Sequence, residues 1–465
     1  MACSLLIDIG STYTKATKID LETLEISARG QAYTTVKEDV TIGLKKALDN
    51  IPDWQNADYK LACSSAAGGL KIIAIGLVPD LTAEAARRAA LGAGSKVLKT
   101  YSYELTDKEI EEIKYLEPDI LLLAGGTDGG NKEIIIHNAT MLANSDIEQT
   151  IIVAGNRSVS QKANDILKKS HKETFLTENV MPRLEELNIE PARRTIREIF
   201  LNKIIHAKGL KKVDELIDGI IMPTPSAVLK AAQLLAEGYK DYEGLGELMI
   251  VDIGGATTDV HSIASGKPTK ANVNWRGLEE PYNKRTVEGD LGMRYSASSL
   301  YSVIGEENFL QSLRDDSDLV LDLETLERYI QYLHKNVSYL AQTKREKEID
   351  KLLGYYAVKY AVARHVGSVK TIYTPMGATV LQEGKDLTNI ETVIGTGGII
   401  INNESPEFLL KGSFYENQDN PELLSPLKPN IFIDKEYILA AGGLMVSELP
   451  LSALKFMKKN LKKVK

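Results

Sequence analysis

The chain has 465 residues, of which 43% are hydrophobic and 26% charged, a composition typical of a soluble globular protein with two to four domains. Its formal net charge of −8 argues against a nucleic-acid binder, which normally carries a basic domain. Cys3 and Cys63 are the only cysteines and lack metal-ligand spacing, which indicates a reducing compartment. The apolar runs are too short for a signal peptide or a membrane span, so we expect a cytoplasmic protein without membrane contact.

The first 64 residues have the pattern of a strand meander. Period-two alternation predicts strands at 4–9, 12–19 and 25–35, with a glycine turn after the first. A helix at 40–50 and a strand at 59–64 follow.

The next segment alternates apolar strands with helices. Strands are predicted at 72–77, 97–103, 119–126, 150–156 and 174–179. This alternation predicts a parallel, doubly wound sheet. Its glycine-rich strand ends, GGTDGGN at 125–131 and AGN at 154–156, are where such a sheet would bind a ligand.

The strand–turn–strand pattern of the opening returns at 248–263, after a helical stretch at 190–240. Long helices at about 295–366 and further strands follow, among them one at 369–373. The repeat predicts a duplicated α/β fold. We expect a first half at 1–64, an inserted α/β domain at 65–210, a helical connection at 211–245, and a second half with a helical subdomain and a C-terminal helix at 246–465.

Two polar hairpin turns follow the first strand of each half: DIGSTYTK (8–15) and VDIGGATTDV (251–260). In the first, Gly10 lets the backbone approach a phosphate, and the Ser11 and Thr12 hydroxyls can donate hydrogen bonds to it. Lys15 can neutralise phosphate charge. Asp8 lies at the strand end, where it can hold Mg²⁺ through water.

The second hairpin repeats these parts, with Asp252 in the place of Asp8. Its turn residues that can meet a phosphate are Gly254, Gly255, Thr257 and Thr258. Asp259 either orients an attacking water or caps the hairpin. Either hairpin alone would more often be an ordinary turn, but two copies facing each other would hold a di- or triphosphate from both sides.

A third glycine cluster, Gly395, Gly397 and Gly398, follows the apolar run at 392–394. Missing side chains there leave room for the flat face of a nucleoside. The chain has no G-x-x-x-x-G-K-[ST], no H-E-x-x-H and no C-x-x-C, which argues against a P-loop enzyme or a zinc centre.

These three motifs resemble the phosphate-1, phosphate-2 and adenosine motifs of the actin-like ATPase superfamily. Over essentially its whole length, the chain also resembles the MutL/GlmL accessory proteins found with glutamate mutase and ornithine aminomutase. The further segments that carry this resemblance are ACSSAAGGLK (62–71), LLAGGTDGGN (122–131), TENVMPR (177–183), MPTPSAV (222–228) and EGDLGMRYSA (288–297). Nothing here resembles the DNA mismatch-repair proteins that share the name MutL.

The resemblance implies a duplicated actin-like (ribonuclease H-like) ATPase fold that binds ATP and Mg²⁺. Asp8 and Asp252 would hold the Mg²⁺ shell, and with Asp259 they are the candidate catalytic residues. The hairpin residues named above would meet the two ends of the phosphates, and the third glycine cluster would flank the adenosine.

The resemblance also implies a function and a partner. The protein would be a slow ATPase that reactivates an adenosylcobalamin-dependent aminomutase by driving the release of damaged cobalamin. The partners would be the mutase subunits, with a homodimer left open. Two alternatives remain: a small-molecule kinase or hydantoinase-type ATP-dependent amidohydrolase with the same clamp, and a non-hydrolysing, nucleotide-gated assembly factor.

Three further polar features have plainer interpretations. Asp290 precedes a predicted helix and could contact a nucleotide or cap the helix, and capping is the favoured expectation. The segment from Asp259 to Ala264 lacks the final glycine of the cobalamin signature D-x-H-x-x-G, so we interpret the match as coincidence. The lysines between 455 and 465 are expected to complement the dipole of a C-terminal helix.

Overall fold

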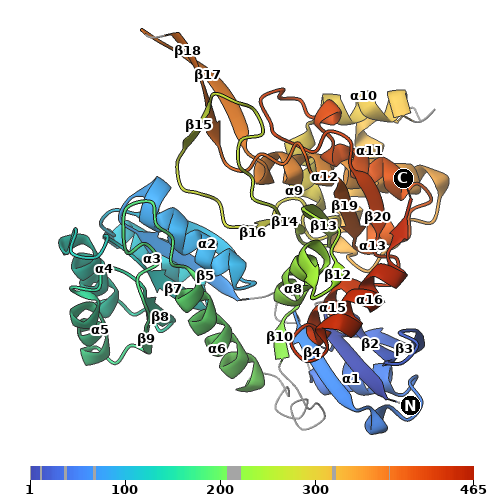
Figure 1. Cartoon of the computed structure of the whole chain (residues 1–465), viewed down its shortest axis with the longest axis horizontal. Coiled ribbons are helices and arrows are strands. Elements are labelled where there is room, and N and C mark those ends of the chain that lie inside the picture. Colours follow the sequence, from blue (N-terminus) through green and yellow to red (C-terminus); the bar gives the residue numbers. More distant parts are fainter. Residues whose placement is uncertain are drawn as a thin grey trace. The chain divides into compact units, whose positions relative to one another are not determined.

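The structure is a computed structural model, which describes residues 2–10, 13–35, 39–65, 70–206, 221–316, 321–375 and 377–464. The chain forms two compact units, whose elements are shown in Figure 1. Unit 1 comprises Met1–Ala231, Gly277–Glu279 and Ala440–Phe456, and unit 2 comprises Ala232–Arg276, Glu280–Leu439 and Met457–Lys465. Within the described residues, none of the helices combines the length and the apolar composition that a membrane span needs.

The first sheet of unit 1 has the strand order β10-β4-β1-β2-β3. Its strands are β1 (Cys3–Ile9), β2 (Tyr13–Asp20), β3 (Ile26–Tyr33), β4 (Tyr59–Ser64) and β10 (Ile221–Pro223). The first three form the predicted antiparallel meander, whereas β4 runs parallel to β1 and β10 parallel to β4. Helix α1 (Val40–Leu48) is capped by Asp39, whose carboxylate accepts a hydrogen bond from the Thr41 amide, and it packs against β2 and β3.

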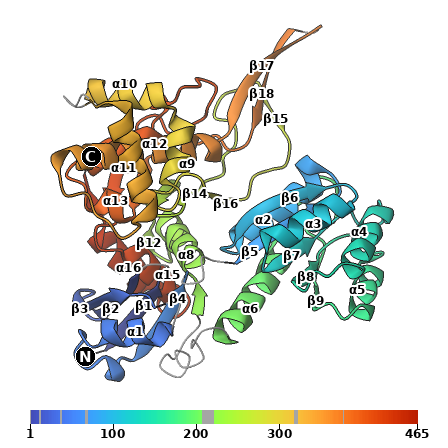
Figure 2. The same cartoon turned by 180° about the vertical axis from the view of Figure 1, so that it is seen from behind.

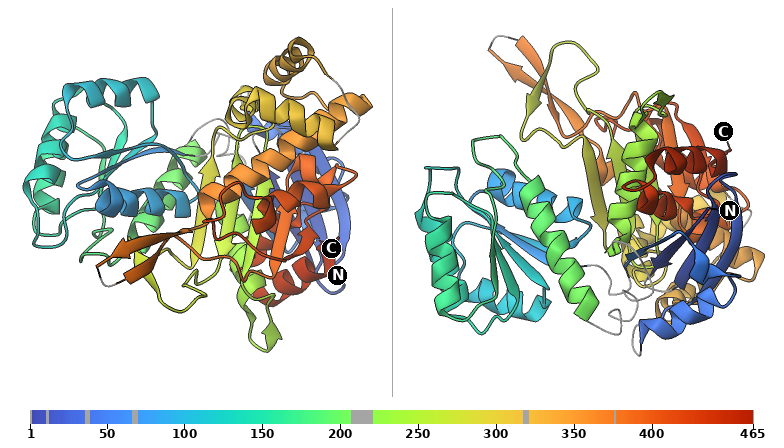
Figure 3. Two further views of the ribbon diagram at one scale, coloured as in Figure 1. Left: turned by 90° about the horizontal axis from the view of Figure 1, so that it is seen from above. Right: turned by 60° about the horizontal axis from the view of Figure 1, so that its bottom comes forward.

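A second sheet of unit 1 lies between β4 and β10 in the chain, and its five parallel strands have the order β6-β5-β7-β8-β9. The strands are β5 (Lys71–Gly76), β6 (Lys96–Ser102), β7 (Ile120–Leu123), β8 (Thr150–Val153) and β9 (Thr174–Leu176). The helices are α2 (Glu84–Gly92), α3 (Asp107–Leu116), α4 (Glu133–Ala143), α5 (Ser160–Lys169) and α6 (Glu190–His206). Alternate strand residues pack with α2 and α6 on one face and with α3, α4 and α5 on the other. Figures 2 and 3 show how these helices are arranged about the sheet.

The large sheet of unit 2 has the order β16-β14-β13-β19-β20-β21. Its strands are β13 (Leu248–Ile253), β14 (Thr258–Ile263), β16 (Asn283–Glu288), β19 (Thr392–Thr396), β20 (Asn430–Ile433) and β21 (Lys462–Lys463). As in the first sheet of unit 1, an antiparallel meander is followed by two strands parallel to its first strand. This shared order is the ribonuclease H-like arrangement, and its duplication confirms the predicted actin-like fold.

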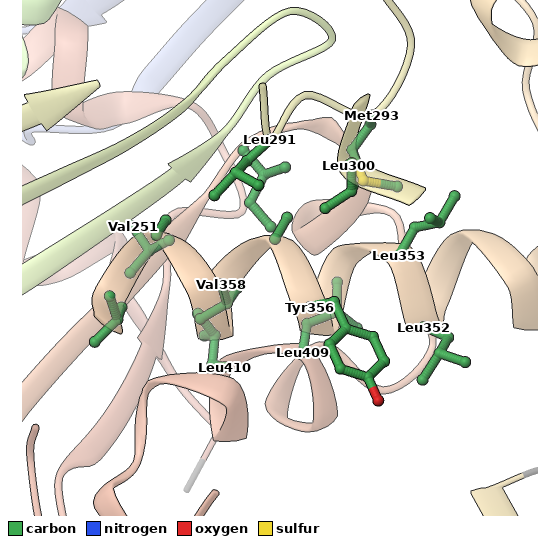
Figure 4. Packing of buried hydrophobic residues seen from close by; sticks show 14 of the residues in the cluster. Val251, Leu291, Met293, Leu300, Leu352, Leu353, Tyr356, Val358, Leu409 and Leu410 are labelled. Carbon is green, nitrogen blue, oxygen red and sulfur yellow. The ribbon is translucent and has the colours of Figure 1, made fainter. Parts of the chain in front are cut away.

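The core of unit 2 forms around α12 (Lys344–His365), which begins with a capping box between Thr343 and Glu346. Figure 4 shows side chains of α12, such as Leu353 and Val358, among buried residues of β13 and of the segment after β16. The other helices beside this core are α9 (Ala297–Ile304), α10 (Glu306–Asp316), α11 (Leu323–Lys335), α13 (Gly398–Ile401) and α14 (Pro406–Leu410). Helix α8 (Thr224–Glu237) begins in unit 1 and ends in unit 2.

Several short elements differ from the sequence predictions. Strand β16 was not predicted, and β15 (Val273–Arg276), β18 (Gly377–Glu383) and β17 (Ser368–Thr374) form a three-stranded sheet of which only 369–373 was predicted. Two short strands, β11 (Gly238–Tyr239) and β12 (Tyr242–Glu243), form a hairpin. Near the C-terminus lie α15 (Ile438–Met445) and α16 (Pro450–Asn460), and β21 pairs with β20 where the helical pattern continued. Strands such as β15 and β21 form by pairing with partner strands that are distant in sequence, and local sequence patterns do not predict such pairing.

The predicted helix cap at Asp290 is wrong. Helix α9 begins at Ala297 and Ser296 precedes it, whereas Asp290 accepts hydrogen bonds of 2.7 and 2.9 Å from the guanidinium of Arg364. These hydrogen bonds lower the pKa of Asp290. The aspartate therefore ties the segment after β16 to the end of α12.

Candidate functional site: two aspartate–glycine hairpins

The first hairpin joins β1 to β2 in unit 1. The Gly10 amide donates a 3.1 Å hydrogen bond to the Tyr13 carbonyl, which closes the turn. Asp8 and Lys15 are directly opposite in the antiparallel register, so their side chains lie on the same face of the sheet. Ser11 and Thr12, the two hydroxyl residues predicted to meet phosphate, lie outside the described residues.

The carboxylate of Asp8 is held at the ends of three parallel strands. Its Oδ1 accepts a 2.7 Å hydrogen bond from the Thr224 hydroxyl, at the start of α8, and one of 3.5 Å from the Cys63 thiol at the end of β4. Burial and the negative charge of Asp8 raise the pKa of Cys63 well above its usual range, so the thiol stays protonated and donates. Thr224 was not predicted as a site residue; its sequence signal is the Pro-Thr-Pro start of a helix.

The second hairpin joins β13 to β14 in unit 2 and closes in the same way. The Gly254 amide donates a 2.8 Å hydrogen bond to the Thr257 carbonyl, three residues on, as Gly10 does in the first hairpin. Gly255 is exposed at the tip. The two hairpins therefore share the same closing hydrogen bond, each directly after a strand whose penultimate residue is an aspartate.

A segment after β16, residues 289–296, straps this second turn. The amides of Met293 and Arg294 donate to the carbonyls of Gly254 and Gly255 at 3.1 and 2.8 Å. The Thr258 hydroxyl is buried and donates to the Leu291 carbonyl at 2.7 Å. A Cβ on Gly292 would lie 2.3 Å from the Ala256 carbonyl carbon, so the strap can approach the turn only with glycine at this position.

The strap is fixed to α12 by a buried ion pair. Arg294 Nη2 lies 2.8 Å from Asp350 Oδ2, and the two side chains are 11% and 3% exposed. Burial raises the pKa of Asp350, and the Arg294 charge opposes this shift. The strap thus holds the backbone of the turn in place before any ligand arrives.

Asp252 and Asp259 are directly opposite in the register of β13 and β14, where Asp8 faces Lys15 in the first hairpin. Two like charges in this position would repel each other. Arg285 on β16 compensates: its guanidinium lies 2.6 Å from Asp259 Oδ1, and the Thr257 hydroxyl donates to Oδ2 at 3.1 Å. Asp259 is therefore an ion-paired, hydrogen-bonded carboxylate, and its partner Arg285 was not found from the sequence.

The three glycines of the downstream cluster have different surroundings. A Cβ on Gly395 would lie 2.6 Å from a Leu410 methyl, so this glycine serves packing within unit 2. Gly397 has φ +99° and its Cβ would lie 2.2 Å from the Ile253 carbonyl oxygen, which brings the start of α13 against the end of β13. Gly398 is exposed, and its position remains open to a ligand.

The phenol of Tyr437 lies beside Gly398, and the sequence analysis did not single it out. A Cβ on Gly398 would lie 3.6 Å from the Tyr437 hydroxyl. Burial and the negative charges of Asp252 and Asp434 raise the pKa of Tyr437, so the hydroxyl stays protonated. Asp434 caps α15, since its carboxylate accepts hydrogen bonds from the amides of Ile438 and Leu439.

The donor set beside each hairpin suits Mg²⁺. In the described part of the chain, no group of three or more His, Cys, Asp or Glu side chains is placed to hold a metal ion. Each hairpin instead offers one aspartate at a strand end beside backbone amides. Mg²⁺ in nucleotide sites is bound in this way, by one or two carboxylates together with phosphate oxygens and water.

Comparisons with known proteins identify relatives over the full length. The sequence profile of the family described as MutL protein matches residues 4–461. The curated Protein MutL of Clostridium tetanomorphum is 50% identical over 469 residues, which cover 100% of both chains.

Solved structures give weaker similarities. Component A of (R)-2-hydroxyglutaryl-CoA dehydratase from Acidaminococcus fermentans is 10% identical with a TM-score of 0.32, and 98% of this chain and 99% of that chain are covered. A ROK family glucokinase from Streptomyces griseus, in complex with glucose and AMPPNP, is 10% identical with a TM-score of 0.36, covering 98% and 100%. The assignment of the fold rests on the strand order of the two sheets.

Proposed function

Since the chain belongs to the MutL protein family, we propose that it is an ATP-binding accessory factor that reactivates an adenosylcobalamin-dependent aminomutase. The observation that carries ATP binding is the repeated hairpin: an aspartate at a strand end, then a glycine whose amide closes a turn on the carbonyl three residues later. Such turns direct backbone amides toward a phosphate while glycine allows close approach.

The roles proposed for the residues follow from their surroundings. Asp8 and Asp252 would hold the water shell of Mg²⁺, which when bound neutralises phosphate charge. Lys15, Gly10, Gly254, Gly255 and Thr257 would contact the phosphates. The Thr258 hydroxyl is already hydrogen-bonded to the strap, so its part would be to position the turn.

The proposed adenosine contacts are Gly397 and Gly398 at the start of α13. Gly395 is enclosed by neighbouring side chains, so it would not contact the adenosine and would affect binding only through the position of β19. Asp259 is held by Arg285 in an ion pair of 2.6 Å. In this proposal Asp259 would orient a water through a hydrogen bond.

The proposed work of ATP is to drive the release of damaged cobalamin from the mutase. This step rests on the resemblance to the accessory proteins of glutamate mutase and ornithine aminomutase. The structure supports this proposal through its duplicated actin-like fold and through the second hairpin, whose turn is held by the strap.

The test is a reactivation assay with the full-length protein. An aminomutase inactivated by turnover is incubated with this protein, Mg-ATP and fresh adenosylcobalamin, and recovered mutase activity is measured. We expect recovery only when all three are present. If mutase activity does not recover, and the rate of phosphate release is the same with and without the mutase, the proposed partner is wrong and a kinase or amidohydrolase is favoured. Full recovery with a non-hydrolysable ATP analogue would indicate a nucleotide-gated assembly factor.

A further inference from the structure

Unit 1 holds a cluster of three cations that are not part of the first hairpin. Arg193 and Arg197 are separated by one helical turn on α6, so they share a face of that helix. Lys230 lies on α8, where burial lowers its pKa and the positive charge of Arg197 lowers it further. Arg193 is 6% exposed, and the other two are half-buried.

Ordinary structural contacts account for part of this cluster. Arg193 forms an ion pair with Glu190, Arg197 Nη2 donates to the Gly92 carbonyl at 3.2 Å, and Lys230 donates to the Ser447 hydroxyl at 3.2 Å. Gly92 ends α2, and a cation at a helix C-terminus is favourable. These contacts provide an acceptor for one N–H-bearing nitrogen of each side chain.

The Nε–H groups of both arginines are left over. In the part of the chain that the structure describes, Arg193 Nε and Arg197 Nε are buried and make no hydrogen bond. A buried N–H without an acceptor costs free energy, more so on a charged group. The Arg193 guanidinium packs on Gly92, where a Cβ would lie 2.1 Å from Nε, so glycine at that position makes room for it.

The charges of the cluster are also unbalanced. Burial lowers the pKa of Arg197, and the neighbouring positive charge of Arg193 lowers it further, while Glu190 opposes these effects. The Glu190 side chain is 62% exposed, so solvent screens its contribution. An anion with two charges would satisfy the spare donors and offset the repulsion.

We propose that Arg193, Arg197 and Lys230 form a binding site for a dianionic oxyanion of the phosphate class. The guanidinium donors are arranged in a planar fork that matches phosphate oxygens, and the ammonium adds a point charge. The site goes beyond ATP binding and does not depend on it. It adjoins the first hairpin along the chain, because α8 carries Lys230 and begins at Thr224, which holds Asp8.

The test titrates the full-length protein with inorganic phosphate by calorimetry at constant ionic strength, with chloride as the balancing anion. Arg197→Gln and Arg193→Gln each remove donors to the anion, and we expect a loss of affinity of about tenfold or more. The matched control is Arg194→Gln, because Arg194 is exposed on the same helix. It should bind as the wild type does. Unchanged affinity in Arg197→Gln would overturn the site.

Thermal unfolding gives an independent readout if Arg193→Gln fails to fold. The melting temperature of each variant without phosphate is the reference; with phosphate, the wild type should gain stability and Arg197→Gln should not. Phosphate binding that is lost in Asp252→Asn but kept in Arg197→Gln would assign the anion to the hairpins and refute the proposal. A parallel titration with glycerol phosphate distinguishes free phosphate from a phosphate ester, and binding of either supports the site.

Discussion

Asp252 and Asp259 have different surroundings, although they face each other across two strands. Asp259 is neutralised by Arg285, whereas the charge of Asp252 acts on the protonated phenol of Tyr437. Asp252 is therefore the carboxylate that we assign to the Mg²⁺ shell in unit 2. A neutral amide at the same position keeps the shape and removes the charge.

Asp252→Asn should abolish phosphate release while leaving the fold intact. The reason is that an amide binds hydrated Mg²⁺ far more weakly than a carboxylate does. Phosphate release and the melting temperature are measured on the same preparations. Asp241→Asn, at an exposed turn, is the matched control and should keep wild-type turnover. Unchanged turnover in Asp252→Asn would disprove the assignment.

Substitutions at two glycines of the downstream cluster should have different effects, one on stability and the other on nucleotide binding. Gly395→Ala drives a Cβ into Leu410, and overpacking of this kind typically costs about 1–3 kcal/mol of unfolding free energy. Gly398→Ala meets only an ordinary 3.6 Å contact with Tyr437 and should melt like the wild type while binding ATP more weakly. Urea unfolding and equilibrium ATP binding report the two effects. Equal ATP affinity in Gly398→Ala would remove α13 from the proposed adenosine site.

At the scale of elements, the strap and α12 determine how rigid the second hairpin is. The strap reaches the turn through backbone hydrogen bonds and reaches α12 through the Arg294–Asp350 ion pair. Because both side chains are buried, removing one partner leaves the other charge uncompensated in the interior. The stability of the turn thus depends on a pair far from the hairpin in sequence.

Arg294→Gln should lower the unfolding free energy by about 3–5 kcal/mol at neutral pH, because Asp350 loses its partner. Burial raises the pKa of Asp350 in the folded protein, so the folded state binds the proton more readily and stability falls as pH rises through the acidic range. Loss of Arg294 raises this pKa further, so the deficit of the variant should shrink as the pH is lowered.

Urea unfolding across the acidic range measures this dependence. Arg328→Gln breaks an exposed ion pair with Glu324 and should cost less than about 1 kcal/mol at any pH. A deficit in Arg294→Gln that stays constant with pH would show that Asp350 is not the group responsible.

At the scale of the whole molecule, the duplicated fold places one aspartate–glycine hairpin in each unit. Mg-ATP should therefore slow amide hydrogen exchange in both hairpins, at 8–15 and at 252–259, because each would have its amides bound to phosphate. Exchange followed by mass spectrometry measures both segments in one experiment. Protection confined to one hairpin would contradict the role of the other, and the peptide at 377–383 serves as the internal control.

The sequence predicted the two hairpin turns, because their conformation depends on local residues. A glycine turn after an apolar strand can be recognised from about ten residues, so both hairpins and their aspartates were found. The contacts that act on those aspartates come from elsewhere in the chain: Thr224 is 216 residues from Asp8, and Arg285 is 26 residues from Asp259. A spacing pattern carries no signal for such partners.

By itself, the sequence determined the duplicated meander, the two aspartate–glycine turns and the family, because these depend on period, turn chemistry and motif order. Only the tertiary structure decided that Asp290 pairs with Arg364, that Gly395 serves packing, and that Arg193 and Arg197 bury unpaired donors beside Gly92. The physical reason is that burial and charge are set by everything that packs around a group. A carboxylate, a glycine or an arginine therefore acquires its role from neighbours that the linear order of residues does not reveal.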